Sequence, residues 1–263
     1  MQSIVEILAQ ELGQKQQYVE NVVNLIDEGN TIPFIARYRK EMHGAMDDTS
    51  LRNLETRLTY LRNLQQRRDE VKKSIENQGK LTQELSEAID AAATMTEVED
   101  LYRPYKQKRR TRGSIAREKG LDPLAQAIFA QDGQDIQELA KDFINEEKGV
   151  ATAEEAIAGA LDIIAENLSD DADIRKALRE LCSRRGSLVS KAADPEADTV
   201  YKLYYDFNQP ISRLLDHQIL AINRGEKEDI LKVTVTLPGN EGPALVSRAA
   251  LKPTMQISQK VKA

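Results

Sequence analysis

The chain has 263 residues, of which 30% are charged and 40% hydrophobic, which fits a soluble globular protein of one large or two small domains. Its single cysteine, Cys182, excludes an intramolecular disulfide, and its two histidines argue against a histidine-based metal centre. No apolar run reaches the roughly 18 residues of a membrane span, and the N-terminus lacks a secretory signal. We therefore expect a cytoplasmic protein without membrane contact, and we expect neither a metal nor a cofactor. The net charge is −6.

Helical patterns fill the first 190 residues. Ser3 and Glu6 have the spacing of a capping box before a helix that Gly13 ends. A second helix is predicted over residues 17–28, and the helix–turn–helix spacing of this pair is one that DNA-binding proteins share. The second helix carries acids and no cation, so a packed helical pair is the alternative to recognition of a DNA groove.

A short third helix is predicted over residues 34–40, with Pro33 in its first turn. Its basic side chains are Arg37, Arg39 and Lys40. Its large apolar side chains are Phe34, Ile35 and Tyr38. The cations could form an anion-binding patch. Alternatively, the apolar side chains pack inward while the cations reach solvent or pair with acids.

One long helix is predicted over residues 49–78, because leucines recur at three- and four-residue spacing and neither Gly nor Pro interrupts it. We expect it to be a spine for shorter helices. Three later helix starts are marked by Thr96 with Glu99, by Asp122 before Pro123, and by Thr152 with Glu155. A helix over residues 171–185 should end at Gly186.

The pattern changes after residue 190, where prolines become frequent and residues 230–237 alternate as a β-strand. A single strand is unstable in water, so its partners lie nearby or it belongs to a domain that the chain does not complete. The fold class is therefore mainly α, a multi-helical array with a helix-turn-helix-like start, a long central helix and one short strand. We expect a helical domain over residues 1–190, a linker with a helix and strand over 191–237, and a flexible tail over 238–263.

Residues 103–119, here called the basic segment, carry eight basic side chains and one acid, a net charge of +7. The eight are Arg103, Lys106, Lys108, Arg109, Arg110, Arg112, Arg117 and Lys119. Residues 132–173 carry thirteen acids and two lysines, a net −11. Local charge rather than the total decides where a polyanion binds, so the acidic total does not exclude nucleic acid.

The basic segment follows a helix that Pro104 ends, so we expect an exposed loop whose cations contact phosphates. Arg109, Arg110 and Arg112 are the main candidates, and Tyr105 could stack on an unpaired base. Residues 114–116 could begin a short helix whose free amides also bind phosphate. The alternatives are contact with a protein and internal pairing with the acidic helices. Phosphate contacts carry no base information, so we expect no sequence-specific recognition.

No glycine-rich phosphate loop, nucleophile elbow or zinc-binding helix motif is present, which leaves an enzyme hypothesis without candidate residues. A cryptic hydrolase would need a carboxylate cluster with a metal. His43 is expected in a surface turn, and Cys182 on a buried helical face.

Several stretches in order resemble the N-terminal region of the bacterial Tex family of transcription accessory proteins. They are residues 31–41, 99–106, 108–112, 116–121 and 220–227. The resemblance is collinear from about residue 3 to about residue 237. It implies a helical region that, in whole members, precedes a YqgF-type domain, helix-hairpin-helix elements and an RNA-binding OB-fold. Family members bind nucleic acid, RNA especially, without a known catalytic step.

The chain stops before those three domains, and residues 238–263 do not resemble the family's continuation. The strand over residues 230–237 then looks like the lead into an absent domain. Residues and resemblance together predict a non-catalytic accessory module of transcription that binds RNA or single-stranded nucleic acid, with DNA as the less favoured ligand. The alternative is a scaffold whose long helix and basic segment dock on RNA polymerase or the ribosome.

Overall fold

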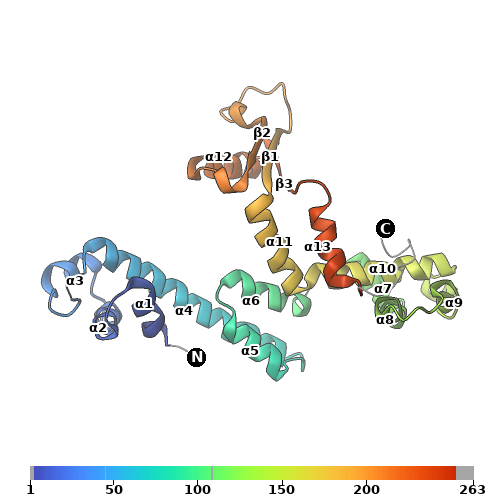
Figure 1. The fold of residues 1–263 in the computed structure, drawn as a ribbon, viewed down its shortest axis with the longest axis horizontal. Helices are drawn as coiled ribbons and strands as arrows, with labels where there is room; N and C mark the ends of the chain where they lie inside the picture. The colour runs from blue at the N-terminus through green and yellow to red at the C-terminus, as the bar shows by residue number, and fades with distance from the viewer. Residues whose placement is uncertain (1–2, 45, 108, 253–263) are drawn as a thin grey trace. The chain divides into compact units, whose positions relative to one another are not determined.

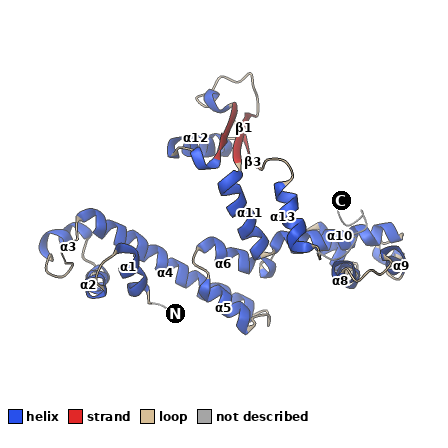
Figure 2. Ribbon diagram, viewed as in Figure 1, coloured by secondary structure: helices blue, strands red, loops and turns tan. Residues whose placement is uncertain are grey.

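A computed structural model describes residues 3–44, 46–107 and 109–252. The chain divides into two compact units, residues 1–105 (unit 1) and residues 106–263 (unit 2). This division falls within the basic segment, whereas the sequence suggests a boundary near residue 190. Helices dominate both units, which confirms the mainly α fold (Figure 2).

Unit 1 is built around one long helix. Its elements are α1 (Ile4–Leu12), α2 (Gln16–Asp27), α3 (Ile32–Tyr38), α4 (Asp48–Glu76), α5 (Gln83–Ala91), α6 (Met95–Tyr102) and the 3-10 turn η1 (Arg103–Tyr105). The helices α1 to α3 lie along the N-terminal half of α4, and α5 and α6 lie along its C-terminal half (Figure 1). The predicted spine is therefore present, with 29 residues and a length of roughly 43 Å.

The leucines of α4 explain this arrangement. Leu51, Leu54, Leu58 and Leu61 lie on one stripe and are buried in a cluster with α1, α2 and α3. Further along, the same helix buries the apolar residues that face α5 and α6 in a second cluster. One periodic sequence thus organises two small cores in series.

Local signals place most helix starts correctly. Ser3 and Glu6 form the predicted capping box, and Gly13 ends α1 in the left-handed conformation that glycine adopts readily. The capping box expected at Thr96 is instead formed by Thr94 with Glu97. Both pairs have the required spacing, but Glu99 accepts a hydrogen bond from Arg67 Nε at 2.6 Å and serves α4 rather than the cap.

His43 lies in a turn, as predicted, but the expectation that this turn leaves it at the surface is wrong. The side chain is buried, and its ring nitrogens have no hydrogen-bond partner within the part of the chain that the structure describes. The neighbouring Gly44 has a φ of 61°, and a Cβ at this position would lie 2.4 Å from the Tyr18 ring. The backbone turn therefore closes against Tyr18 and carries the imidazole inward.

Two bidentate ion pairs fasten the N-terminal helices to α4. Arg57 donates to both carboxylate oxygens of Glu11, at 2.7 and 2.6 Å, and Arg62 does the same to Asp27, at 2.7 and 2.8 Å. These hydrogen bonds, and to a smaller extent the charge of each arginine, hold the pKa of both carboxyl groups below their ordinary values. Both pairs are well exposed, so solvent screening limits what they contribute.

Replacing these acids should give a pH-dependent loss of stability. We expect Glu11→Gln with Asp27→Asn to lower the free energy of unfolding by about 1 kcal/mol at pH 7. Because the folded-state pKa values are lowered, the difference is full above the ordinary values of 4.5 and 3.8 and disappears as pH falls through the lowered ones. Urea titrations between pH 7 and this acidic range measure it. Glu20→Gln, which replaces an exposed acid of α2 outside these two ion pairs, is the control.

Unit 2 joins a helical cluster to a small sheet. Its helices and 3-10 turns are α7 (Arg112–Glu118), α8 (Asp122–Ala130), α9 (Ile136–Lys141), η2 (Glu146–Lys148), α10 (Ala153–Asp170), α11 (Ala172–Arg185), η3 (Lys202–Tyr204), η4 (Ile211–Arg213), α12 (Asp216–Lys227) and α13 (Glu241–Ala250). Its strands are β1 (Ser187–Ala192), β2 (Asp206–Pro210) and β3 (Leu231–Thr236). The helix α10 buries Ala156, Ala160 and Ile163 against α7, α8 and α9.

The predicted strand is present as β3, and its partners lie nearby within the chain, which was the first of the two alternatives. It pairs antiparallel with β1, which also pairs with β2, in the order β2-β1-β3. The helix α12 packs on β3, where a Cβ at Gly225 would lie 2.7 Å from Leu231. The prediction missed β1 and β2 because neither has the clear alternation that marks β3.

The segment from residue 238, expected to be a tail, contains a helix in its described part. The helix α13 packs along α11, with Glu241 Oε1 2.8 Å from Arg185 Nη2. Lys252 then donates its amide to Gln131 at 3.0 Å. Residues 253–263 lie outside the described residues. Over the ranges that the structure describes, no helix has the length and apolarity that crossing a membrane requires.

Candidate nucleic-acid interface

The basic segment begins in unit 1, where it follows α6 without a break. Arg103 and Tyr105 lie in η1, Arg103 exposed and Tyr105 half-buried against the second apolar cluster of α4. The carbonyl of Tyr105 accepts a hydrogen bond from Gln78 Nε2 at 3.1 Å. The ring therefore serves the core in part, which leaves less of it for a base than the stacking prediction assumes. Lys108, also predicted to contact phosphate, lies outside the described residues.

In unit 2 the segment continues into α7, whose start is capped from within the chain. Thr111 Oγ1 accepts from the amide of Ser114 at 3.0 Å, and Ser114 Oγ accepts from the amide of Thr111 at 2.9 Å. The amide of Ser114, expected to be open to a phosphate, is therefore already bonded. A side-chain cap of this kind fixes the direction in which the preceding residues enter the helix.

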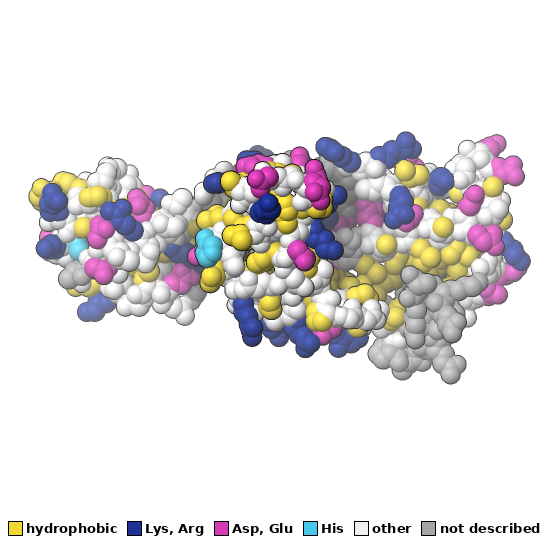
Figure 3. Space-filling view, turned by 90° about the horizontal axis from the view of Figure 1, so that it is seen from above, with side chains coloured by type: hydrophobic (Ala, Val, Ile, Leu, Met, Phe, Trp, Pro, Cys, Tyr) yellow, Lys and Arg dark blue, Asp and Glu magenta, His cyan; other side chains and the backbone are white. Residues whose placement is uncertain are grey.

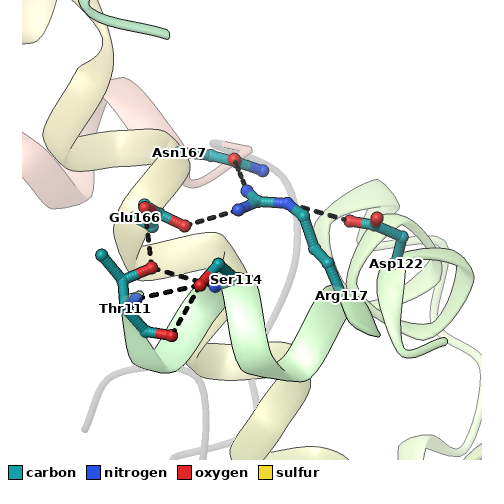
Figure 4. Close-up of polar contacts among 6 residues, drawn as sticks. All are labelled: Thr111, Ser114, Arg117, Asp122, Glu166 and Asn167. Atoms are coloured by element: carbon teal, nitrogen blue, oxygen red, sulfur yellow. Dashed lines mark hydrogen bonds and ion pairs between the residues drawn. The ribbon is translucent and has the colours of Figure 1, made fainter. Parts of the chain in front are cut away.

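Arg117 is held inside unit 2 by three partners from two other helices. Its guanidinium donates to Glu166 and to Asn167 Oδ1, the latter at 2.7 Å, and lies 3.4 Å from Asp122 Oδ1 (Figure 4). Thr111 Oγ1 also donates to Glu166, at 3.1 Å. The side chain of Glu166 is only 12% exposed. It contacts both Thr111, the N-cap residue of α7, and Arg117, which lies about one and a half turns further along the same helix.

Gly113 permits this close approach of α7 to α10. A Cβ at this position would lie 2.4 Å from Glu166 Oε2 and 3.2 Å from the Asp162 carbonyl oxygen. Any side chain would therefore displace the carboxylate that holds Arg117. The glycine and the arginine belong to one packing arrangement between α7 and α10.

The basic segment consequently separates into two kinds of cation. Arg117 and Lys119 hold the unit together, since Lys119 Nζ donates to the Gly149 carbonyl at 2.7 Å. For Arg117, which binds Glu166, the structure matches the alternative of internal pairing with the acidic helices, whereas Lys119 bonds to a backbone carbonyl. The other described cations that the basic segment contributes to unit 2, with Lys106 among them, are exposed and lie before α7 or at its first residue.

Three of these cations, here called the exposed arginines, lie just before α7 or at its first residue. They are Arg109, Arg110 and Arg112. Arg112 is 87% exposed, and its Nε lies 3.6 Å from Asp162 Oδ1. Arg110 is 71% exposed, with Nη2 3.2 Å from Glu118 Oε2. Among the described residues no carboxylate pairs with Arg109. Ion pairs this exposed are worth little, so a phosphate could replace the carboxylates at low cost.

The second predicted patch lies on α3 in unit 1. Ile32 and Ile35 are buried against α4, while Phe34 and Tyr38 lie on the opposite, exposed face. The predicted inward packing is therefore wrong for both aromatic residues. A helix of seven residues offers only one narrow face to its neighbour, and residues three apart, Ile32 and Ile35, occupy it.

The aromatic residues lie among the three cations of the patch. The rings of Phe34 and Tyr38 are 5.2 Å apart, and the guanidinium of Arg39 lies 5.5 Å from the centre of the Phe34 ring. Hydrophobic and basic side chains lie side by side at the end of unit 1 that carries α3 (Figure 3). The four-residue spacing of Phe34 and Tyr38 places them on one helix face, but it does not indicate whether that face is buried or exposed.

The polar face of α4 is different, because its cations are largely engaged within unit 1. Arg57 and Arg62 bind Glu11 and Asp27, Arg67 binds Glu99, and Lys72 Nζ lies 2.6 Å from Asp90 Oδ1. Within the described ranges, no cluster of three or more His, Cys, Asp or Glu side chains is placed to hold a metal ion.

Comparison with known proteins identifies both ends of the chain. The profile "Tex-like protein N-terminal domain" matches residues 2–76, and "Tex central region-like" matches residues 131–262. The second match includes most of the segment after residue 238, so the expectation that this segment departs from the family is wrong.

Curated relatives match almost the whole chain. "Protein tex" of Bordetella pertussis is 46% identical over 89% of this chain, which is 30% of that protein. "Transcriptional accessory protein Tex" of Neisseria gonorrhoeae is 39% identical over 92% of this chain and 32% of its own length. Human "S1 RNA-binding domain-containing protein 1" is 30% identical over 89% of this chain and 24% of its own length. The chain thus spans about a third or less of its relatives, and by these matches it belongs to the Tex family.

Proposed function

We propose that this chain is a non-catalytic nucleic-acid-binding module that acts in transcription, and that the exposed arginines contact the phosphates. The observation that carries the proposal is the arrangement of Arg109, Arg110 and Arg112 on the approach to α7, exposed and at most weakly paired. Three adjacent guanidinium groups can each donate two hydrogen bonds to a phosphate. The rigid start of α7 supports them, because Thr111 and Ser114 fix its direction.

The names of relatives support the same class of ligand. One relative is called a transcriptional accessory protein and another an S1 RNA-binding domain protein. We take RNA as the preferred ligand over DNA on this basis. The surface itself contacts phosphates, which both polymers share, and we expect it to be indifferent to base sequence.

The scaffold alternative has less support from the structure. It requires the basic face of α4 to dock on an acidic surface of RNA polymerase or the ribosome. The ion pairs of Arg57, Arg62, Arg67 and Lys72 would first have to be broken. Partners that remain bound after nuclease treatment of a cell lysate would favour the scaffold.

Replacing the exposed arginines should weaken RNA binding. We expect Arg109→Ala with Arg110→Ala and Arg112→Ala to lower the affinity for a labelled single-stranded RNA about tenfold or more, because charge-assisted hydrogen bonds to phosphate are lost. Fluorescence anisotropy at low salt measures the change.

A matched control removes the same charge elsewhere. Arg52, Lys141 and Lys202 are surface cations, each paired with an acid three or four residues away. Their triple alanine variant should bind RNA within about twofold of the unmodified chain, since none of the three belongs to the basic segment and exposed ion pairs of this kind contribute little. Equal binding by the exposed-arginine variant and the unmodified chain would refute the proposed role.

A further inference from the structure

We propose that the exposed face of α3 is a second contact that takes unpaired bases, with Tyr38 as the stacking residue. This inference rests on the proposed function and names the form of nucleic acid that the chain prefers. The surface, here called the α3 surface, is defined by its exposed aromatic and basic side chains. They are Phe34, Arg37, Tyr38, Arg39 and Lys40.

In the aromatic pair, the Tyr38 side chain is more exposed than the Phe34 side chain. Phe34 has Tyr38 on one side at 5.2 Å, and the Arg39 guanidinium lies 5.5 Å from its ring centre. These contacts use much of the Phe34 ring, which is 37% exposed. Tyr38 is 57% exposed and has room for a further flat partner. Phe34 therefore positions Tyr38 rather than receiving a base itself.

The charges around this ring remain available. No carboxylate pairs with Arg37, Arg39 or Lys40 anywhere in the described ranges. The acids that follow Glu41 along the chain are engaged, because Asp47 caps α4 and Asp48 binds Arg52. Only Glu41 adjoins the cations in sequence, so residues 37–41 keep a net charge of +2.

This combination fits single strands better than a duplex or an acidic protein. A base must leave its stack before its face can meet an aromatic ring, and unpaired bases are free to do so. Three cations beside the ring match the phosphates that flank such a base. An acidic peptide would satisfy the cations but would leave Tyr38 without a flat partner.

The test compares two oligomers that differ only in their bases. One is a labelled single-stranded oligouridylate of about 12 nucleotides, and the other is an abasic strand with the same number of phosphates. Both are titrated into the full chain carrying Arg109→Ala, Arg110→Ala and Arg112→Ala, so that the remaining binding reports on the α3 surface. Tyr38→Ala in this background should weaken binding of oligouridylate about tenfold and change binding of the abasic strand less than twofold.

Controls separate stacking from folding and from charge. Tyr38→Phe keeps the ring and should retain the affinity. Phe129→Ala removes an aromatic side chain of α8 that is also exposed and should change neither titration. Arg37→Ala with Arg39→Ala should weaken the binding of both oligomers to a similar degree. Circular dichroism of each variant confirms that the helices remain.

The outcomes distinguish this inference from the proposed function. If Tyr38→Ala leaves oligouridylate binding unchanged while the exposed arginines still matter, the stacking role is wrong and the proposed function stands. A loss of equal size with both oligomers would also overturn stacking, because the abasic strand has nothing to stack. If the exposed-arginine background binds RNA as the unmodified chain does, the proposed function fails whatever Tyr38 contributes.

Discussion

Leu54→Ala is expected to lower the free energy of unfolding of unit 1 by about 3 kcal/mol. The side chain is fully buried where α4 meets the N-terminal helices, and it lies in the cluster that holds them together. Truncation removes buried methyl groups and leaves a cavity that the neighbouring helices fill only in part. Urea unfolding of the full chain, with hydrogen exchange to locate the change, measures this loss.

The control for Leu54 is a leucine on a surface. Leu220, on α12, is 69% exposed, and Leu220→Ala should change stability by less than about 0.5 kcal/mol. Because the buried leucine belongs to unit 1, faster hydrogen exchange in Leu54→Ala should concentrate in residues 3–105. Similar losses in the two variants would contradict the role of α4 as the spine.

Glu166→Ala is expected to destabilise unit 2 by about 2 kcal/mol. It removes the main partner of Arg117 and the acceptor of the Thr111 hydroxyl, and among the described residues it leaves Asn167 and Asp122 beside the partly buried guanidinium. Breaking one side of a fully buried pair costs more, about 3–5 kcal/mol, but Arg117 is 35% exposed. Thermal or urea unfolding gives the difference.

Two further variants show whether the loss comes from the pair. Glu154→Ala removes an exposed acid from the first turn of the same helix and should cost less than about 1 kcal/mol. Replacing both partners, Arg117→Met with Glu166→Leu, should be less harmful than Glu166→Ala alone, because no buried charge is then unpaired. If the double variant is the less stable, the network is not what holds α7 to α10.

The helices could be predicted from sequence because their signals are local. The Ser3 and Glu6 pair, the leucine stripe of α4 and the Asp171 cap of α11 each lie within a few residues of the structure they specify. The error at Thr96 shows the limit of such signals. Two overlapping pairs fit one capping pattern, and a contact with Arg67 on a distant helix decides between them.

The interface could be predicted only in part because it depends on distant partners. Nothing near Arg117 in sequence indicates that it binds Glu166, which is 49 residues away. A count of cations cannot separate such a residue from Arg112, which remains exposed. In the same way, composition does not show which face of α3 meets α4, and that choice puts Tyr38 on the surface rather than in the core.

The dependence of RNA affinity on salt bears most directly on the exposed arginines. Each phosphate contact on a single strand contributes a slope of about −0.7 to log affinity against log salt. Removing Arg109, Arg110 and Arg112 should therefore make the slope shallower by about 2, and the control at Arg52, Lys141 and Lys202 should leave it unchanged. Parallel lines for the unmodified chain and the exposed-arginine variant would contradict phosphate contact by these residues.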